Sequence, residues 1–389
     1  MENDKKQNGA GLVVKTLENL QVETIFGIPG LHNLDIYDSL LSSNIEHITT
    51  RHEQGAGFMA DGYARTTNKP GVCLVISGPG LTNIITPMGE AMADSVPMVV
   101  ISSQLPTSVV DQDIGFLHEL ENSTNLIDSV AKQSKRVMHK EQITTSIREA
   151  YKLAMSGRPG PVHVEIPLDI LQETISDVDS LLTNNINLSS NNWDISNQED
   201  KIKKTVNFLE NADNPVIIAG GGSTQAAEEL EKIIERLNIP VVQTIAGKGV
   251  VSEEHPLCLG CTMIYKDIRE KISQSDCILA VGTQIAPTDL EGAQLEIDGT
   301  LIQIDIDPGN FRKNYKADIG LKGDSKQLLK EINRQLDRTN FSSNTKDNIF
   351  DSVNLSKDEL KDLRGLDSTK LDFSLEILKG IRQAIPADG

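Results

Sequence analysis

The sequence predicts an α/β protein with two doubly wound domains, each built on a parallel sheet. Short runs that are apolar throughout recur along the chain and end at Gly or Pro, and segments with apolar residues at helical spacing separate them. Such runs are typical of parallel strands that helices cover on both faces. A stretch rich in Asn and Ser, 183–192, interrupts the pattern and has the composition of a linker.

The first domain is predicted to span residues 1–178. Its first helix is expected from Ala10 to Leu20, where apolar residues recur at helical spacing. The predicted strands follow at 24–30, including a Gly/Pro turn, and at 45–49, 72–76, 97–102 and 161–167. Because helical segments lie between most of these runs, the strands are expected to pair in parallel.

A linker over 179–196 is predicted to lead into a second, Rossmann-like domain at 197–338. Its strands are expected at 215–223, including a Gly-rich turn, and at 240–245, 277–281 and 300–306, with a helix from Thr224 to Leu237. A second linker, 339–368, precedes a helical pattern from Phe373 to Ile385. One helix after a linker suggests that residues 369–389 begin a third, truncated domain.

Composition excludes several classes of function. The chain has 389 residues, of which 38% are hydrophobic, and its net charge is −19 with a pI near 4.8. Because the carboxylates are scattered, this acidity argues against nucleic-acid binding. The N-terminus is polar and no apolar stretch is long enough to span a bilayer, so we expect a soluble, cytoplasmic protein without membrane contact.

The cysteines give little indication of a metal or redox site. There are four, and Cys258 and Cys261 form a Cys-x-x-Cys pair. No second pair and no His at zinc-finger spacing follows them, so buried apolar packing is the favoured interpretation. No metal ligand is predicted within this chain.

Glu53 is the first candidate for a functional residue. It follows the predicted strand 45–49 and precedes a helix whose small residues permit close packing, so it lies at a strand-to-helix turn. Ligands of open α/β sheets bind at such turns. Two interpretations stay open on these residues alone: a partly desolvated carboxylate with a chemical role, or a solvated residue that caps the helix.

Two Gly-rich turns, Gly78-Pro79-Gly80 and Gly220-Gly221-Gly222, each follow an apolar run and precede a helical pattern. Backbone N–H groups at such a place can bind phosphate, but a tight turn without a ligand fits equally well. Pro79 removes one donor, and neither turn completes a dinucleotide-binding motif. Walker A, His-Glu-x-x-His and Gly-x-Ser-x-Gly motifs are absent from the sequence, so the hydrolases and NTPases that carry them are not supported.

Several separated motifs match one family together. They lie at 26–30, 51–56, 60–65, 77–83, 156–162, 247–249 with 255–257, and 304–308. In this order the chain resembles the thiamine diphosphate-dependent enzymes of the acetolactate synthase and 2-oxo acid decarboxylase superfamily. The resemblance implies a pyrimidine-binding domain, a central domain and the start of a pyrophosphate-binding domain. The Gly-Asp-Gly motif and Asn that hold Mg²⁺ and the diphosphate in that last domain do not occur here, so the chain alone is expected to be inactive.

The resemblance also implies roles for individual residues. Glu53 would hydrogen-bond to N1′ of the cofactor's aminopyrimidine and promote the C2 carbanion that attacks a 2-oxo acid before CO₂ leaves. The other residues expected to line the cofactor site are Ile28, Pro29, Gly30, Gly78, Pro79, Gly80 and Asn83. The family further implies a homodimer or homotetramer whose active sites are shared between subunits.

The segment 113–121 indicates the subfamily. Acetolactate synthases typically have Gln where this chain has His118, and the segment looks more like the 5-guanidino-2-oxopentanoate decarboxylases. A His near the cofactor can relay a proton, although a histidine on a surface loop is the simpler interpretation of the residue alone. The carboxylates that could meet a guanidinium are Asp111, Asp113, Glu119 and Glu121.

Three alternatives remain open. An acetolactate synthase-type carboligase would share the same motifs. Arg158 lies where the flavin-contacting arginine of those synthases lies, so FAD is conceivable, but 260–263 and 282–292 lack the other flavin motifs. A nucleotide-binding module or regulatory fragment without catalysis is the alternative from another class.

Overall fold

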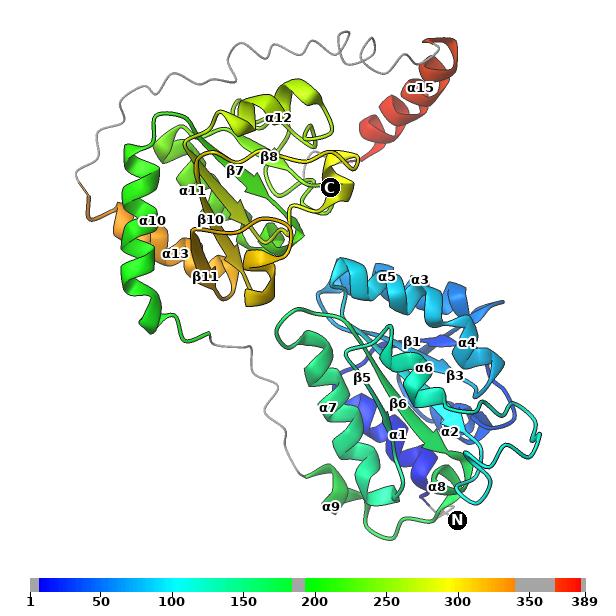
Figure 1. Ribbon diagram of the computed structural model, residues 1–389. Helices are drawn as coiled ribbons and strands as arrows, with labels where there is room; N and C mark the ends of the chain where they lie inside the picture. Colours follow the sequence, from blue (N-terminus) through cyan, green and yellow to red (C-terminus); the bar gives the residue numbers. More distant parts are fainter. Residues whose placement is uncertain (1–6, 184–192, 340–367, 386–389) are drawn as a thin grey trace. The chain divides into compact units, whose positions relative to one another are not determined.

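The computed structural model describes residues 7–183, 193–339 and 368–385 (Figure 1). The chain forms two compact units that divide between Asn192 and Trp193. Each unit contains one sheet in which all strands pair in parallel. The predicted class, two doubly wound α/β domains, is therefore confirmed.

The sheet of the first unit has six strands in the order β2-β1-β3-β4-β6-β5. Their bounds are β1 Thr24–Gly27, β2 Glu46–Thr49, β3 Gly71–Val75, β4 Met98–Gln104, β5 Gln133–Arg136 and β6 Pro161–Pro167. The chain places β2 on one side of β1 and β3 on the other, so its direction along the sheet reverses between β1 and β3. Ligands of doubly wound sheets bind at such a reversal, outside the carboxyl ends of the strands.

Helices cover both faces of this sheet (Figure 1). They are α1 Gly9–Asn19, α2 Leu34–Leu40, α3 Glu53–Thr67, α4 Pro79–Asn83, α5 Ile85–Asp94, α6 Ser123–Asp128, α7 Ile143–Met155, α8 Leu168–Gln172 and α9 Val178–Leu182. Along β3, Val72 and Leu74 belong to the core beneath α1 and α7, whereas Cys73 and Val75 belong to the core beneath α3 and α5. This alternation explains why the strand is apolar throughout.

The second unit repeats the plan with five strands in the order β11-β10-β9-β7-β8. Their bounds are β7 Pro215–Ala219, β8 Val241–Gln243, β9 Cys277–Val281, β10 Thr300–Asp305 and β11 Ile319–Lys322. The helices are α10 Glu199–Asn211, α11 Ala227–Leu237, α12 Lys266–Ser273, α13 Ser325–Leu336 and α15 Ser368–Ala384. Ile217 faces the core with α11 and α13, and Ile218 faces the core with α12.

Two edge strands, β5 and β11, were not predicted from the sequence. β5 reads Gln-Ser-Lys-Arg and is only half-buried, so it lacks the apolar run that marks the central strands. The helix expected from Thr224 begins instead as a 3₁₀ turn, Gly221–Ala226. The hydroxyls of Ser223 and Thr224 donate to the carbonyls of Gly220 and Gly221 there, which competes with regular helix formation.

The predicted linkers are only partly described. α9 extends into the range 179–196, because the Asp177 side chain caps it by accepting from the Ser180 N–H and Val178 is buried. Most of the second linker, 340–367, lies outside the described residues, and α15 follows at the predicted terminal helix. Within the described ranges, every helix is too short or too polar to cross a membrane.

Candidate active site

Glu53 begins α3 and is buried, with 8% of its surface exposed. The helix is capped by His52 instead, because its Nδ1 accepts the N–H of Gln54 at 3.1 Å. The interpretation of Glu53 as a solvated cap is therefore wrong. A carboxylate that is removed from water requires hydrogen-bond partners, and its nearest one comes from α4.

Asn83 supplies that partner, since its Nδ2 donates to Oε2 of Glu53 at 2.9 Å. Gly80 lies beside the other oxygen. A Cβ added at Gly80 would come within 3.4 Å of Oε1 of Glu53 and 2.6 Å of the Ile76 side chain. The glycine therefore keeps the space beside Oε1 narrow but free of a side chain. Three of the predicted site residues, Glu53, Gly80 and Asn83, are thus in one place.

Gly78 brings His118 to the same edge of the sheet. Its φ of 62° lies in the left-handed region that favours glycine, and a Cβ there would lie 2.6 Å from the carbonyl oxygen of His118. His118 also has a positive φ, 66°, and is half-buried. Its Nδ1 is buried without a hydrogen-bond partner among the described residues. His118 therefore lies on a surface loop, but its ring is directed partly inward.

The turn after β1, which contains Ile28, Pro29 and Gly30, packs against the turn after β3. Gly30 donates its N–H to Oδ1 of Asn33 at 2.7 Å, and a Cβ at Gly30 would lie 2.5 Å from Ile76 Cδ1. Pro29 is exposed, as is Pro79 in the neighbouring turn. Apart from Arg158, the predicted site residues therefore gather at the carboxyl edge of the sheet, around the β1–β3 reversal.

His32 is a residue of this site that sequence reasoning missed. It is 3% exposed, and its Nδ1 lies 2.9 Å from Oγ of Ser77. Its ring meets that of His118 edge to face, with centroids 5.7 Å apart. Burial, and then the neighbouring His118, lower the pKa of His32. The available signal was a histidine two residues after the Gly-Ile-Pro-Gly turn at Gly30.

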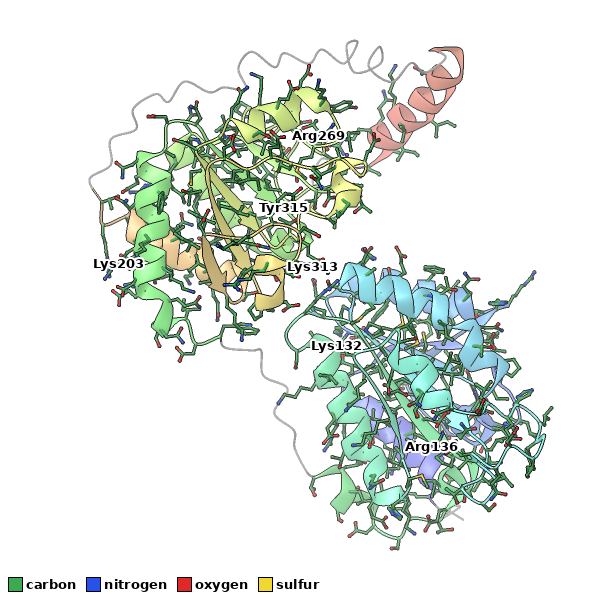
Figure 2. All side chains as sticks on the ribbon, viewed as in Figure 1. Lys132, Arg136, Lys203, Arg269, Lys313 and Tyr315 are labelled. Atoms are coloured by element: carbon green, nitrogen blue, oxygen red, sulfur yellow. The ribbon has the colours of Figure 1, made fainter. Side chains whose placement is uncertain are left out.

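The loop 105–122, which carries His118, is anchored to the sheet by Arg136 (Figure 2). The guanidinium of Arg136 donates to Asp111 at 2.5 Å and to Glu165, which is fully buried, at 2.5 Å. Gln104 also donates to Glu165, at 2.8 Å. Asp111 is therefore already paired, so it is a poor candidate for a guanidinium-bearing substrate.

Glu119 is engaged within its own loop. Its carboxylate accepts the N–H of Phe116 at 2.8 Å and of Ile114 at 3.1 Å, and these backbone bonds lower its pKa. Of the four carboxylates proposed from the sequence for a guanidinium, Asp113 and Glu121 are the exposed pair that remains.

Arg158 lies away from this site, beside the C-terminal end of α5. Its guanidinium donates to Oγ of Ser95 at 2.7 Å and to the carbonyl of Ala93 at 2.7 Å. Nearby, the Nζ of Lys132 (Figure 2) donates to the carbonyls of Leu153, Ser156 and Arg158. Burial lowers the pKa of Lys132 to about 8. Both cations therefore donate hydrogen bonds to backbone carbonyls at the ends of α5 and α7.

The second unit has a group of side chains that could meet a cation, Glu231, Glu235 and His255, whose ligand atoms lie within 4.8 Å of one another. However, Nδ1 of His255 accepts the N–H of Leu257 at 3.1 Å. That bond leaves the proton of a neutral imidazole on Nε2, so neither ring nitrogen offers a free lone pair. The group is therefore a poor metal site.

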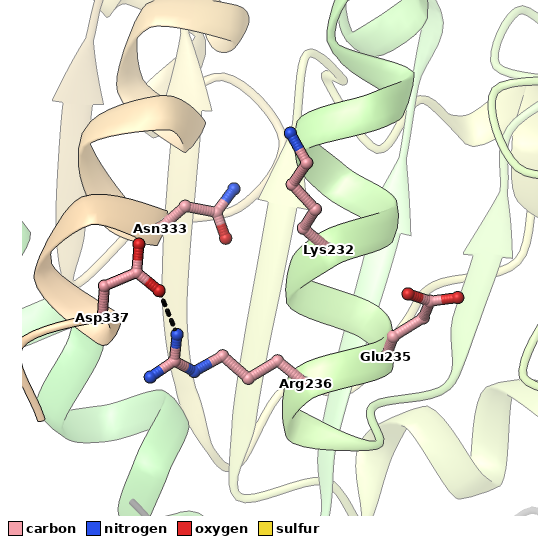
Figure 3. A pocket seen from close by; sticks show the side chains of 5 residues that line it. All are labelled: Lys232, Glu235, Arg236, Asn333 and Asp337. Carbon is pink, nitrogen blue, oxygen red and sulfur yellow. Dashed lines mark hydrogen bonds and ion pairs between the residues drawn. The ribbon is translucent and has the colours of Figure 1, made fainter. Parts of the chain in front are cut away.

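A hollow of about 420 Å³ lies between α11 and α13 (Figure 3). Its lining residues are Lys232, Glu235, Arg236, Asn333 and Asp337. Arg236 is paired with Asp337 at 2.5 Å, and Lys232 with Glu228 at 2.8 Å. Because its cations are already neutralised, this hollow does not provide a strong anion site.

A buried carboxylate lies at the strand-order reversal, flanked by turns from neighbouring strands, which is where doubly wound domains bind small molecules. Residues 7–131 match the thiamine pyrophosphate enzyme N-terminal TPP binding domain, and residues 202–332 match the thiamine pyrophosphate enzyme central domain. The chain therefore belongs to the thiamine pyrophosphate enzymes. The predicted family is confirmed.

Similar proteins with curated names fall into two groups. A probable 2-ketoarginine decarboxylase of Pseudomonas aeruginosa is 38% identical over 341 residues, which cover 85% of this chain and 58% of that protein. A probable acetolactate synthase large subunit of Methanococcus aeolicus is 38% identical over 354 residues, 88% of this chain and 58% of that protein. The Escherichia coli acetolactate synthase isozyme 3 large subunit is 36% identical over 331 residues, 84% and 57%. The chain thus spans somewhat more than half the length of these relatives.

The contact between Gly78 and His118 can be tested against a matched glycine. Gly115 lies in the same loop as His118 and also has a positive φ, 74°, but a Cβ there would meet nothing within 4 Å. We expect Gly115→Ala to lower the stability of the first unit by about 1 kcal/mol, the cost of the backbone conformation alone. Gly78→Ala should cost about 2–4 kcal/mol, because the steric clash adds to that strain.

Hydrogen–deuterium exchange of β3 and β4 peptides measures both losses in the intact chain, because these buried strands open only when the first unit unfolds. Equal losses of protection in the two variants would contradict the close approach of His118 to Gly78.

Proposed function

We propose that this chain contributes the aminopyrimidine side of a thiamine diphosphate site and acts in the decarboxylation of a 2-oxo acid. The observation that carries the proposal is the buried carboxylate of Glu53, whose Oε2 is bonded to Asn83 at 2.9 Å while Gly80 keeps side-chain atoms away from Oε1. The residues present fit the cofactor, because a buried acid beside a glycine and a buried imidazole nitrogen without a partner among the described residues can both bond a polar group.

These contacts suggest a role for each residue of the site. Bound thiamine diphosphate supplies a carbon nucleophile and an electron sink for decarboxylation. Glu53 holds a proton at Oε1 for the pyrimidine ring, while Asn83 fixes the orientation of the carboxyl group. His118, with its buried Nδ1, serves as the group that returns a proton to the product. Ile28, Pro29, Gly30, Gly78 and Pro79 line the site with backbone.

The proposed substrate is 5-guanidino-2-oxopentanoate, also called 2-ketoarginine. In support, the Pseudomonas aeruginosa relative carries that name, and a histidine at position 118 suits proton return to an aldehyde product. Asp113 and Glu121 are the proposed partners of the guanidinium, because they are exposed and Asp111 and Glu119 are engaged. The second candidate function is that of an acetolactate synthase large subunit, which relatives of similar identity favour.

The proposed protein is a cytoplasmic homodimer or homotetramer in which subunits share active sites. Apolar side chains exposed close to the site support a partner there: Phe58 and Met59 on α3 are 43% and 48% exposed, and Ile114 and Leu117 are 58% and 60% exposed. The site gathers two imidazoles, one carboxylate and one amide, which is not the set of oxygen ligands that Mg²⁺ requires. We therefore assign Mg²⁺ and the diphosphate to residues outside this site. We keep the domains 1–178 and 197–338 as proposals; each range lies within one of the two α/β units.

FAD is not part of the proposal. Arg158, the residue that the family resemblance links to flavin, is committed to Ser95 and to backbone carbonyls at the end of α5. We expect the purified protein to be colourless. A flavin absorbance spectrum that survives extensive dialysis would contradict this expectation.

Glu53→Gln tests the role of the carboxylate. The chain is joined to the C-terminal remainder of the Pseudomonas aeruginosa relative and given thiamine diphosphate and Mg²⁺, and proton exchange at the reactive carbon is followed by NMR. We expect the substitution to slow exchange by about 10²-fold or more, because the amide cannot hold the proton. Glu46→Gln, the same change at an exposed position of β2, is the control and should exchange normally. Normal exchange in Glu53→Gln removes Glu53 from this role.

Substrate preference separates the two candidate functions. The chain is joined in turn to the C-terminal remainder of the Pseudomonas aeruginosa decarboxylase and of the Escherichia coli synthase, so that a preference common to both fusions belongs to this chain. We expect kcat/KM for 2-ketoarginine to exceed that for pyruvate by about 10-fold or more in both. Acetolactate formed from pyruvate as the main product in both fusions would favour the synthase.

A further inference from the structure

The loops after three neighbouring strands bring two histidines together at the site. His32 follows β1, Ser77 follows β3, and His118 lies on the loop after β4. Oγ of Ser77 lies 2.9 Å from Nδ1 of His32, and the rings of His32 and His118 meet at 88° with centroids 5.7 Å apart. The next residue, Gly78, packs against the backbone of His118. One turn thus contacts both histidines.

Burial and hydrogen bonding hold His32 and its neighbours in place. It is 3% exposed, and Ser77 is 1% exposed with its N–H directed to Oγ of Ser103 at 3.3 Å. The adjacent Asn33 is fully buried and accepts the N–H of Gly30. The ring of His32 is therefore buried and fixed. His118 is half-buried, and its Nδ1 has no hydrogen-bond partner among the described residues.

The charge of the pair is constrained by its surroundings. Two imidazolium ions at this separation repel each other, and burial penalises a charge on His32 in particular. Three nearby carboxylates are bonded to other groups: Glu53 bonds Asn83, Glu119 bonds the N–H groups of Ile114 and Phe116, and Asp111 pairs with Arg136. The two others on the His118 loop, Asp113 and Glu121, are exposed to solvent. Burial therefore favours the neutral form of His32.

We propose that His32 is a positioning residue: fixed by Ser77, it sets the orientation of the His118 ring. The inference rests on the proposed function, in which His118 returns a proton to the product. It adds that the His118 ring is held in one orientation for that transfer, because the His32 ring against it is buried and bonded to Ser77.

The coupling is measured by NMR titration of histidine-labelled protein, using the 389-residue chain itself. His118→Asn removes the neighbouring charge, and Asn tolerates the positive φ at this position. We expect the titration midpoint of His32 to rise by about half a pH unit or more in this variant. His47, which packs against Tyr37 with its Nε2 3.4 Å from the carbonyl of Gly27, is the internal control and should not move. An unchanged His32 midpoint would overturn the proposal.

Measurements of kcat, KM and the pH profile of the fused enzyme distinguish a positioning role of His32 from a purely structural one. Ser77→Ala frees the His32 ring without adding volume, and we expect kcat to fall by about 5–10-fold with KM nearly unchanged and with the acidic limb of the pH profile displaced. His32→Phe keeps an aromatic wall and should retain more kcat than His32→Ala. Equal kcat in both, with an unshifted pH profile, would contradict a positioning role. If NMR coupling is present but His118→Asn leaves decarboxylation unchanged, the proposed catalytic role of His118 fails while the coupling stands.

Discussion

The site depends on how closely the turn after β3 approaches the loop after β4. At Gly78 the two backbones are so near that a single added carbon would lie 2.6 Å from the carbonyl oxygen of His118. Neighbouring parallel strands are about 4.8 Å apart, and the backbones of the turns that follow them can approach this closely only where a side chain is absent. Ser77 and Gly80 belong to the same turn as Gly78, Glu53 lies beside Gly80, and His32 lies beside Ser77.

A second constraint is the burial of charge beneath the same loop. Glu165 is fully buried on β6, and removing such a charge from water is costly unless it is paired and hydrogen-bonded. Arg136 and Gln104 supply the bonds, and Arg136 reaches on to Asp111 in the loop. The loop is therefore attached to the interior of the domain by an ion pair whose loss would leave Glu165 unpaired.

Much of the fold followed from the sequence because parallel strands covered on both faces are apolar throughout, and β3, β6 and β9 lie within one residue of their predicted bounds. The polar edge strand β5 has no such signal. Glu53 and Gly80 were found because local motifs mark them. His32 and Arg136 were not, because their partners, Ser77 and Glu165, are 45 and 29 residues away and only the folded sheet brings them together.

The contact at Gly78 touches the carbonyl oxygen, Cα and Cβ of position 118, none of which depends on the rest of that side chain. The course of the loop at position 118 therefore does not depend on which functional group the side chain carries. Any residue that accepts a left-handed backbone, such as His or Asn, can be installed at position 118 while the loop keeps its course. Divergence between relatives with different activities could then proceed by exchanging one functional group on an unchanged frame.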